Sequence, residues 1–354
     1  MKPIKAAIVS IEGSELSDDE KRIIKNENPL GIALFVRNIK TPKQLKNLNK
    51  QIKEIAERDD FIIAVDQEGG RVCRLKSPYF RNYVSQSAMI SPGEEEARKI
   101  AKLHAELIAD DLHNVGVNCN FAPTLDVAAP DITDALKNRC FSENEKIVAE
   151  LGKIIFDTYN QNAIIPCIKH LPGHSGATVD PHLDLPKIDK INNKYFYPFE
   201  QITPDALMAM TAHIVINEID NKPITMSKKA ISEIIRNRFN FKGIIVSDAL
   251  EMHALSGSLT ERTQTSISAG CDVVCYCRGD KDGVMEVLDN CGYLSDNAME
   301  VLGKINMIIN ATYTKQNIEQ KDIEYKQLSE KTISIKNDYD AVEVLNKLYA
   351  KKMQ

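Results

Sequence analysis

Short apolar runs recur along the chain, separated by longer polar stretches. They are mostly continuous and rich in Ile and Val, which is typical of strands buried on both faces of a parallel sheet. The runs cover Ala6–Ile11, Gly31–Val36, Phe61–Val65, Val117–Phe121, Ile164–Ile168, Ala206–Thr211, Gly243–Ser247 and Asp272–Tyr276. The pattern therefore predicts eight buried strands.

Amphipathic helical patterns lie between these runs. The predicted N-caps are Thr41, Ser91, Ser142, Ser227 and Ser295. Thr41 and Ser91 each precede a proline, which is favoured at the first helical position, and Ser142 stands three residues before Glu145, as in a capping box. Strands that alternate with helices, without a flexible linker, predict a single (β/α)8 TIM-type barrel of the α/β class. We expect the barrel to cover residues 1–315, and residues 316–354 to form a helical extension or tail rather than a separate domain.

Polar side chains stand at or just beyond the carboxyl ends of the predicted strands. They are Asp66, Asp126, Lys169, His170, His213 and Asp248. A doubly wound sheet needs similar elements, and periodicity alone does not exclude it. In a barrel, however, these strand ends converge on one mouth, where barrel enzymes place their catalytic groups. The polar positions therefore favour the barrel and predict an active site at its mouth.

Composition narrows the range of functions. The chain of 354 residues is 43% hydrophobic and 27% charged, and its net charge of −5 opposes non-specific binding to nucleic acid. No apolar stretch approaches the ~18–20 residues of a membrane span, and the first residues lack a signal-peptide pattern. We therefore expect a cytoplasmic protein with reduced cysteines. Cys275 and Cys277 form the one close pair, and the lack of a second pair argues against a zinc–thiolate site.

Residues 169–186, KHLPGHSGATVDPHLDLP, have neither helical nor strand periodicity. They follow an apolar run and are rich in histidine, which is more typical of an active-site loop than of a linker. Asp180 stands two residues before His182, where its carboxylate could orient the imidazole. From the residues alone, these two could be a catalytic pair, a metal site completed by His170 and His174, or a structural contact. We expect His174 to brace the loop through hydrogen bonds.

Four motifs carry a resemblance to a known family. They are AVDQEGGRVCRL (Ala64–Leu75), NFAPTLDV (Asn120–Val127), KHLPGHSGATVDPH (Lys169–His182) and GIIVSDALEM (Gly243–Met252). In this order they resemble the motifs of glycoside hydrolase family 3 over residues 5–310. K-H-x-P-G-H followed by D-x-H is similar in particular to the short, single-domain bacterial β-N-acetylhexosaminidases of cell-wall recycling.

The resemblance implies a retaining β-glycosidase. Asp248 would be the nucleophile, His182 the general acid and base, and Asp180 the group that orients His182. The residues that would bind the terminal sugar are Asp66, Arg74, Arg139, Lys169 and His170. The expected substrate is N-acetylglucosamine β-1,4-linked to 1,6-anhydro-N-acetylmuramic acid, with or without its peptide. We expect no cofactor, no metal and no nucleic-acid or membrane partner, and a monomeric protein.

A histidine can replace the usual second carboxylate, because its ordinary pKa of about 6.5 suits proton exchange near neutral pH. The sequence departs from the family pattern at Ser175, where glycine is usual, at Pro181, where serine is common, and at Ala249, where a second aspartate is frequent. Three other hypotheses stay open at this stage. They are a phosphorylase that uses the same site, a metal-dependent hydrolase, and a sugar-binding barrel without catalysis.

Overall fold

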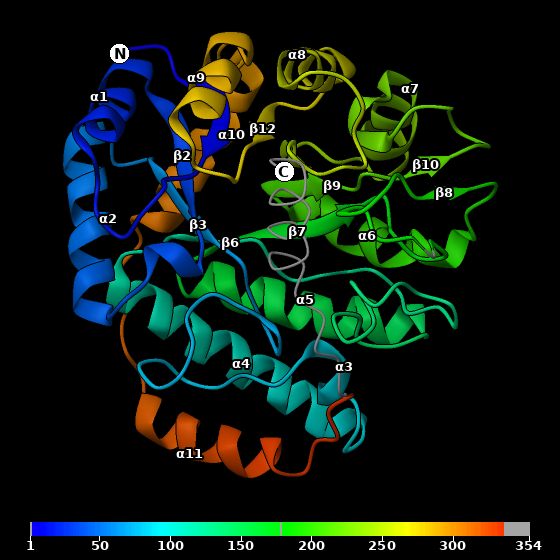
Figure 1. Ribbon diagram of the computed structural model, residues 1–354. Coiled ribbons are helices and arrows are strands. Elements are labelled where there is room, and N and C mark those ends of the chain that lie inside the picture. The colour runs from blue at the N-terminus through cyan, green and yellow to red at the C-terminus, as the bar shows by residue number, and fades with distance from the viewer. Residues whose placement is uncertain (1, 178, 336–354) are drawn as a thin grey trace, which may run out of the picture.

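The computed structural model describes residues 2–177 and 179–335. Within them, eight parallel strands form a closed barrel (Figure 1). The strands are β1 (Lys5–Val9), β2 (Pro29–Leu34), β3 (Ile62–Val65), β6 (Cys119–Asn120), β7 (Ile165–Leu171), β9 (Met208–Thr211), β11 (Ile244–Ala249) and β12 (Val273–Cys275). They follow one another round the barrel in this order, and β12 pairs with β1. All eight predicted strands and the (β/α)8 barrel are confirmed, and the doubly wound sheet is wrong.

The barrel wall leaves no room for a side chain at Gly31. Gly31 of β2 stands opposite Ile62 of β3. A Cβ atom on Gly31 would lie 2.3 Å from the carbonyl oxygen of Ile62, so no side chain fits between these strands. The interior is filled by apolar side chains that include Cys119 and Cys167, which act there as small hydrophobes.

Helices cover the outside of the barrel (Figure 1). They are α1 (Asp18–Glu27), α2 (Pro42–Ala56), α4 (Glu94–Val115), α5 (Glu145–Gln161), α6 (Tyr197–Ile202), α7 (Lys228–Ala230) with the π-helical segment Ile231–Arg238, α8 (Leu259–Ala269), α9 (Lys281–Asn290) and α10 (Asp296–Ile309). Shorter pieces are α3 (Gln86–Met89) and the 3-10 turns Val36–Asn38, Asn193–Tyr195, Thr203–Asp205 and Ile224–Met226. Two small sheets pair β4 (Gln67–Gly69) with β5 (Val72–Cys73), and β8 (Lys187–Ile188) with β10 (Val215–Ile216).

Three of the five predicted helix caps are confirmed. The side chains of Thr41, Ser227 and Ser295 accept the backbone N–H of Gln44, Ala230 and Ala298, respectively. Each bond satisfies one of the N–H groups that have no partner inside the helix.

The caps predicted at Ser91 and Ser142 are wrong. Helix α4 begins later, after Gly93, whose φ of +113° is a conformation that glycine adopts readily. Helix α5 is capped by Asn144 through the N–H of Lys146, while the hydroxyl of Ser142 accepts the N–H of Asn144 itself. Asn144 therefore caps α5 in place of Ser142, which the capping-box spacing had predicted.

Beyond residue 315 the chain forms helix α11 (Ile318–Ser329), which packs against α4 (Figure 1). Tyr325 is its buried residue, and its hydroxyl accepts the N–H of Val84 at 3.0 Å and lies 3.2 Å from Nδ1 of His104. This helix lies within the extension that we expected over 316–354, and residues 336–354 of that extension lie outside the described part of the chain.

Candidate active site

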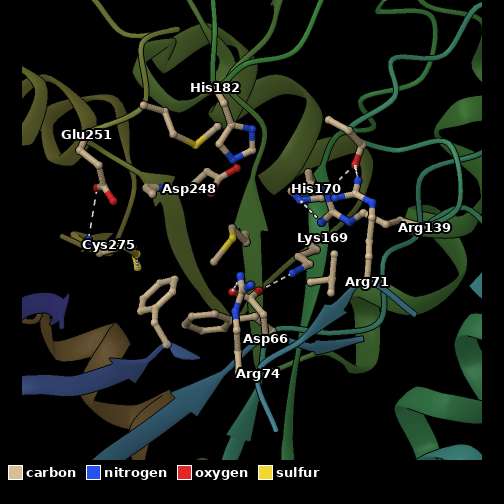
Figure 2. A pocket seen from close by; sticks show the side chains of 18 residues that line it. Asp66, Arg71, Arg74, Arg139, Lys169, His170, His182, Asp248, Glu251 and Cys275 are labelled. Carbon is tan, nitrogen blue, oxygen red and sulfur yellow. Dashed lines mark hydrogen bonds and ion pairs between the residues drawn. The ribbon is translucent and has the colours of Figure 1, made fainter. Parts of the chain in front are cut away.

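A cavity of about 140 Å³ opens at the carboxyl ends of the barrel strands. Seven of the eight predicted site residues line it: Asp66, Arg74, Arg139, Lys169, His170, His182 and Asp248 (Figure 2). The eighth, Asp180, is hydrogen bonded to His182. The fold therefore gathers all eight from distant parts of the sequence around one space.

Lys169 projects from β7 between two carboxylates. Its Nζ lies 2.7 Å from Oδ1 of Asp66 and 2.6 Å from Oε1 of Glu68. Nη2 of Arg74 donates to Oδ2 of Asp66 at 3.0 Å. Burial alone would raise the pKa of Asp66, but Lys169 and Arg74 outweigh burial and lower this pKa to about 2. Asp66 is therefore ionised and held in one orientation.

Arg139 and Glu68 form a two-bond ion pair beside this lysine. Nε and Nη2 of Arg139 each donate to a different oxygen of Glu68 at 2.8 Å. Burial would raise the pKa of Glu68, but Arg139 and Lys169 hold it well below its usual range. Glu68 also raises the pKa of Arg139 against the effect of burial. Such two-bond pairs fix both side chains in one plane.

Glu68, which is only 2% exposed, was not among the predicted site residues. A local signal was present, because side chains two residues apart on an extended strand point to the same side. Asp66 and Glu68 stand in that relation, and both contact Lys169.

His170 has a defined tautomer in this arrangement. Nη2 of Arg139 lies 3.3 Å from Nε2 of His170, and an arginine can only donate, so Nε2 accepts. Nδ1 then carries the hydrogen and donates to Oδ2 of Asp126 at 2.7 Å. Asp126, which is fully buried, thus orients His170.

Asp180 and His182 lie on the segment that follows β7. Nδ1 of His182 lies 2.7 Å from Oδ1 of Asp180, and the same oxygen accepts the backbone N–H of His182 at 2.9 Å. Burial would raise the pKa of Asp180, but its hydrogen bond with His182 outweighs burial and lowers it. With Nδ1 engaged, Nε2 of His182 is the ring nitrogen left for chemistry in the cavity.

A backbone hydrogen bond at Pro181 connects the segment that carries His182 with the residues that follow β11. The carbonyl oxygen of Pro181 accepts the N–H of Ala254 at 3.1 Å. Asp248, near the end of β11, lines the cavity together with His182. With proline at position 181, the loop is therefore hydrogen bonded to the segment that follows β11.

Asp248 is stabilised in its ionised form. Burial would raise its pKa, but the imidazoles of His213 and His170 and the N–H of Ala249, at 2.8 Å from Oδ1, outweigh burial and lower it. His213 also donates from Nε2 to the carbonyl of Ala249 at 3.0 Å, and its Nδ1 lies 2.8 Å from Oγ1 of Thr225. These bonds fix the backbone that carries Asp248.

Glu251, Cys275 and Cys277 also line the cavity. Glu251 and Cys275 are labelled in Figure 2. Oε2 of Glu251 accepts the N–H of Cys277 at 3.2 Å. Burial is the main reason why the pKa of Glu251 is raised to about 7. Glu251 was not among the predicted site residues, because it stands three residues after Asp248, beyond the predicted strand.

His174 braces the loop through its backbone and not through its side chain. Neither ring nitrogen has a hydrogen-bond partner, although the ring is buried. Burial lowers the pKa of His174 to about 4, so the ring is neutral at pH 7. The bracing comes from the backbone N–H of His174, which donates to Asp126 at 2.5 Å, and from the hydroxyl of Ser175, which donates to the carbonyl of Val127 at 2.5 Å.

Neither a metal-binding cluster nor a membrane-spanning helix is found in the part of the chain that the structure describes. Over 2–177 and 179–335, no group of three or more His, Cys, Asp or Glu side chains has the arrangement of a metal site. None of the helices described over those ranges is long and apolar enough to cross a membrane.

Carboxylates, histidines and cationic side chains that gather at the carboxyl ends of the strands of a (β/α)8 barrel lie where enzymes of this fold place their catalytic groups. The chain belongs to glycosyl hydrolase family 3, because the model of that family's N-terminal domain matches residues 4–305. The resemblance seen in the four sequence motifs is thereby confirmed.

Relatives of known name agree with this membership. A protein named β-hexosaminidase from Psychromonas ingrahamii is 32% identical over 298 residues, which cover 82% of this chain and 86% of that protein. A β-hexosaminidase of Haemophilus influenzae is 31% identical over 80% of this chain and 82% of its own length. The crystal structure of native NagZ from Neisseria gonorrhoeae matches with a TM-score of 0.81 and 27% identity, over 92% of this chain and 98% of that one. Another structure of that NagZ holds N-trifluoroacetyl-D-glucosamine.

Proposed function

We propose that this enzyme is a retaining exo-β-N-acetylglucosaminidase that releases terminal N-acetylglucosamine from peptidoglycan fragments. The expected substrate is N-acetylglucosamine β-1,4-linked to 1,6-anhydro-N-acetylmuramic acid, with or without peptide. The observation that carries the proposal is that Asp248 and the Asp180–His182 pair meet at one cavity with a group of paired charges. We call this group the charged floor; it consists of Asp66, Glu68, Arg74, Arg139 and Lys169. The β-hexosaminidase names of the relatives support the sugar.

The charged floor binds the terminal sugar. Asp66 offers carboxylate oxygens to hydroxyl groups, while Arg74, Arg139 and Lys169 offer N–H groups, and all of them line the cavity. Their charges are already paired with one another and with Glu68. The groups are therefore held in place before the sugar arrives, and little ordering is needed when it binds.

In the first step, Asp248 attacks the anomeric carbon and His182 protonates the glycosidic oxygen from Nε2. The carboxylate of Asp180 stabilises the imidazolium and keeps the hydrogen on Nδ1. In the second step, the neutral Nε2 removes a proton from water, which attacks the anomeric carbon and frees Asp248. Two displacements at one carbon retain the β configuration.

Replacement of the proposed catalytic groups tests the site. We expect Asp248→Ala and His182→Ala each to lower turnover of a chromogenic β-N-acetylglucosaminide by at least roughly 100-fold. The matched control is Asp184→Ala, which removes an exposed carboxylate two residues after His182 and should leave turnover close to wild type. Near-wild-type activity in both Asp248→Ala and His182→Ala contradicts the proposed roles.

Analysis of the products tests the reaction. Mass spectrometry of digested muropeptides should show free N-acetylglucosamine, and proton NMR should show the β-anomer first. A first product with the α configuration contradicts the retaining mechanism. Sugar 1-phosphate that forms only in phosphate buffer would instead identify a phosphorylase, and loss of activity in a chelator would identify a metal-dependent enzyme.

The proposal also places the enzyme in the cytoplasm as a monomer. All eight cysteines are free, seven of them buried, which fits a reducing compartment. Cell fractionation and size-exclusion chromatography of the purified chain test these two points.

A further inference from the structure

Two cysteines line the cavity beside Asp248 and have no part in the proposed reaction. Cys275 ends β12, and Cys277 stands two residues later, so their side chains point to the same side. Their sulfur atoms lie 3.4 Å apart. A disulfide bond is about 2.05 Å long, so the two sulfurs are free thiols in contact.

The backbone holds both thiols in this position. The N–H of Cys275 donates to the hydroxyl oxygen of Ser247 at 2.9 Å. Nη2 of Arg37 donates to the carbonyl oxygen of Cys277 at 2.7 Å, and Glu251 accepts the N–H of Cys277. Hydrogen bonds on either side of Tyr276 thus fix the separation of the sulfurs before any ligand arrives.

The separation suits one thiophilic atom bound to both sulfurs. Two sulfurs bound to one tetrahedral centre at about 2.3 Å stand about 3.8 Å apart, which the side chains reach from 3.4 Å by a small rotation. Zinc in a structural site takes four protein ligands, and no third His, Cys, Asp or Glu completes a metal site among the described residues. The atom that fits this site is therefore one that forms bonds to two sulfurs only and already carries a third substituent.

We propose that Cys275 and Cys277 form a dithiol site in the wall of the catalytic cavity that binds trivalent organic arsenic compounds and thereby blocks the cavity. With phenylarsine oxide, two arsenic–sulfur bonds form and the arsenic–oxygen bond breaks. The oxygen leaves as water with the two thiol protons, and arsenic remains trivalent. The adduct then stands next to Asp248, in the space that the proposed function assigns to the sugar (Figure 2).

The bond-forming step is expected to be slow. The contact with Cys275 and burial raise the pKa of Cys277 well above its usual value, and the thiolate is the reactive form of a thiol. The rate of adduct formation should therefore rise with pH, and a dithiol reagent should reverse it better than a monothiol.

Intact-protein mass spectrometry tests the site directly on the full chain. Phenylarsine oxide should add one phenylarsenic group per wild-type chain, with loss of two hydrogens. Neither Cys275→Ser nor Cys277→Ser should form this stable adduct. Cys119→Ser, which removes another thiol of the barrel interior, should form it as the wild type does. Circular dichroism before treatment shows whether each variant is folded.

Two outcomes overturn the proposal: no adduct on the folded wild type, or an adduct that persists in both Cys275→Ser and Cys277→Ser. Free N-acetylglucosamine should slow adduct formation, and hydrolysis should fall in proportion to the modified fraction. An adduct that leaves hydrolysis intact overturns the blocking of the cavity. Because mass spectrometry needs no substrate, failure of the proposed function would not change the adduct result.

Discussion

Replacing Glu68 by alanine tests whether the charged floor is held together as one unit. In the wild type, this carboxylate receives two hydrogen bonds from Arg139 and contacts Lys169. Without it, a guanidinium and an ammonium group face each other in a buried site, and of the carboxylates that Lys169 contacts only Asp66 remains. Arg139 and Lys169 then lose the negative charge that compensates the free-energy cost of burying them.

The expected loss is large. Removing one partner of a buried ion pair costs roughly 3–5 kcal/mol, because an uncompensated charge is left behind. Glu68 serves two cations and is ionised in the folded chain, so we expect Glu68→Ala to lower the free energy of unfolding by about 4 kcal/mol. We also expect kcat/KM to fall about 100-fold, since Arg139 and Lys169 lose the geometry that positions the sugar.

Urea unfolding at pH 7 with linear extrapolation measures the first effect, and steady-state kinetics measures the second. Glu68→Gln keeps the shape and one acceptor oxygen, so its losses should be smaller than those of Glu68→Ala. Glu143→Ala removes an exposed glutamate and should stay within about 0.5 kcal/mol of wild type. If Glu68→Ala is within about 1 kcal/mol of wild type and keeps its kcat/KM, the floor is not held by this carboxylate.

Two further predictions concern stability. Burial raises the pKa of Glu251 from 4.5 to about 7, so between these values the folded chain holds a proton that the unfolded chain releases. Stability should therefore fall by up to about 3 kcal/mol as pH rises from 4.5 to 7, and Glu251→Gln should remove this part of the pH dependence of urea unfolding. Gly31→Ala would place a Cβ atom 2.3 Å from the carbonyl oxygen of Ile62 and should lower the unfolding free energy by at least about 1–3 kcal/mol. Its control is Gly303→Ala in α10, where a Cβ atom would meet nothing within 4 Å, and which should stabilise by about 0.5–1 kcal/mol.

Each of these two predictions has a result that would contradict it. An unchanged pH dependence in Glu251→Gln would mean that this carboxyl group titrates normally in the folded chain. A Gly31→Ala variant as stable as Gly303→Ala would mean that β2 and β3 can separate at no cost.

The strands were predictable because each is a continuous apolar run, and that property is local. The barrel followed from their number, from the alternation with helices, and from the polar residues at the strand ends. Some cavity residues could be found for the same reason, since Asp66 directly follows β3, and Lys169 and Asp248 lie within the last three residues of β7 and β11. Helix starts were less certain, because several polar residues compete to cap one helix, as Asn144 and Ser142 do.

The tertiary structure alone determined which residues that are distant in sequence contact each other. Glu68 meets Lys169 and Arg139 only because the barrel brings the segment after β3, strand β7 and the connection between β6 and α5 to one mouth. Burial, which sets the pKa of Glu251 and leaves the ring of His174 without a partner, depends on the whole chain around a group. The sequence by itself thus indicated that Asp66, Lys169, His170 and Asp248 reach the cavity, through periodicity and strand ends, whereas Arg74 and Arg139 were predicted from the family resemblance. Only the closed barrel determined which charges pair, because electrostatic energy depends on distance in space and on exclusion of water.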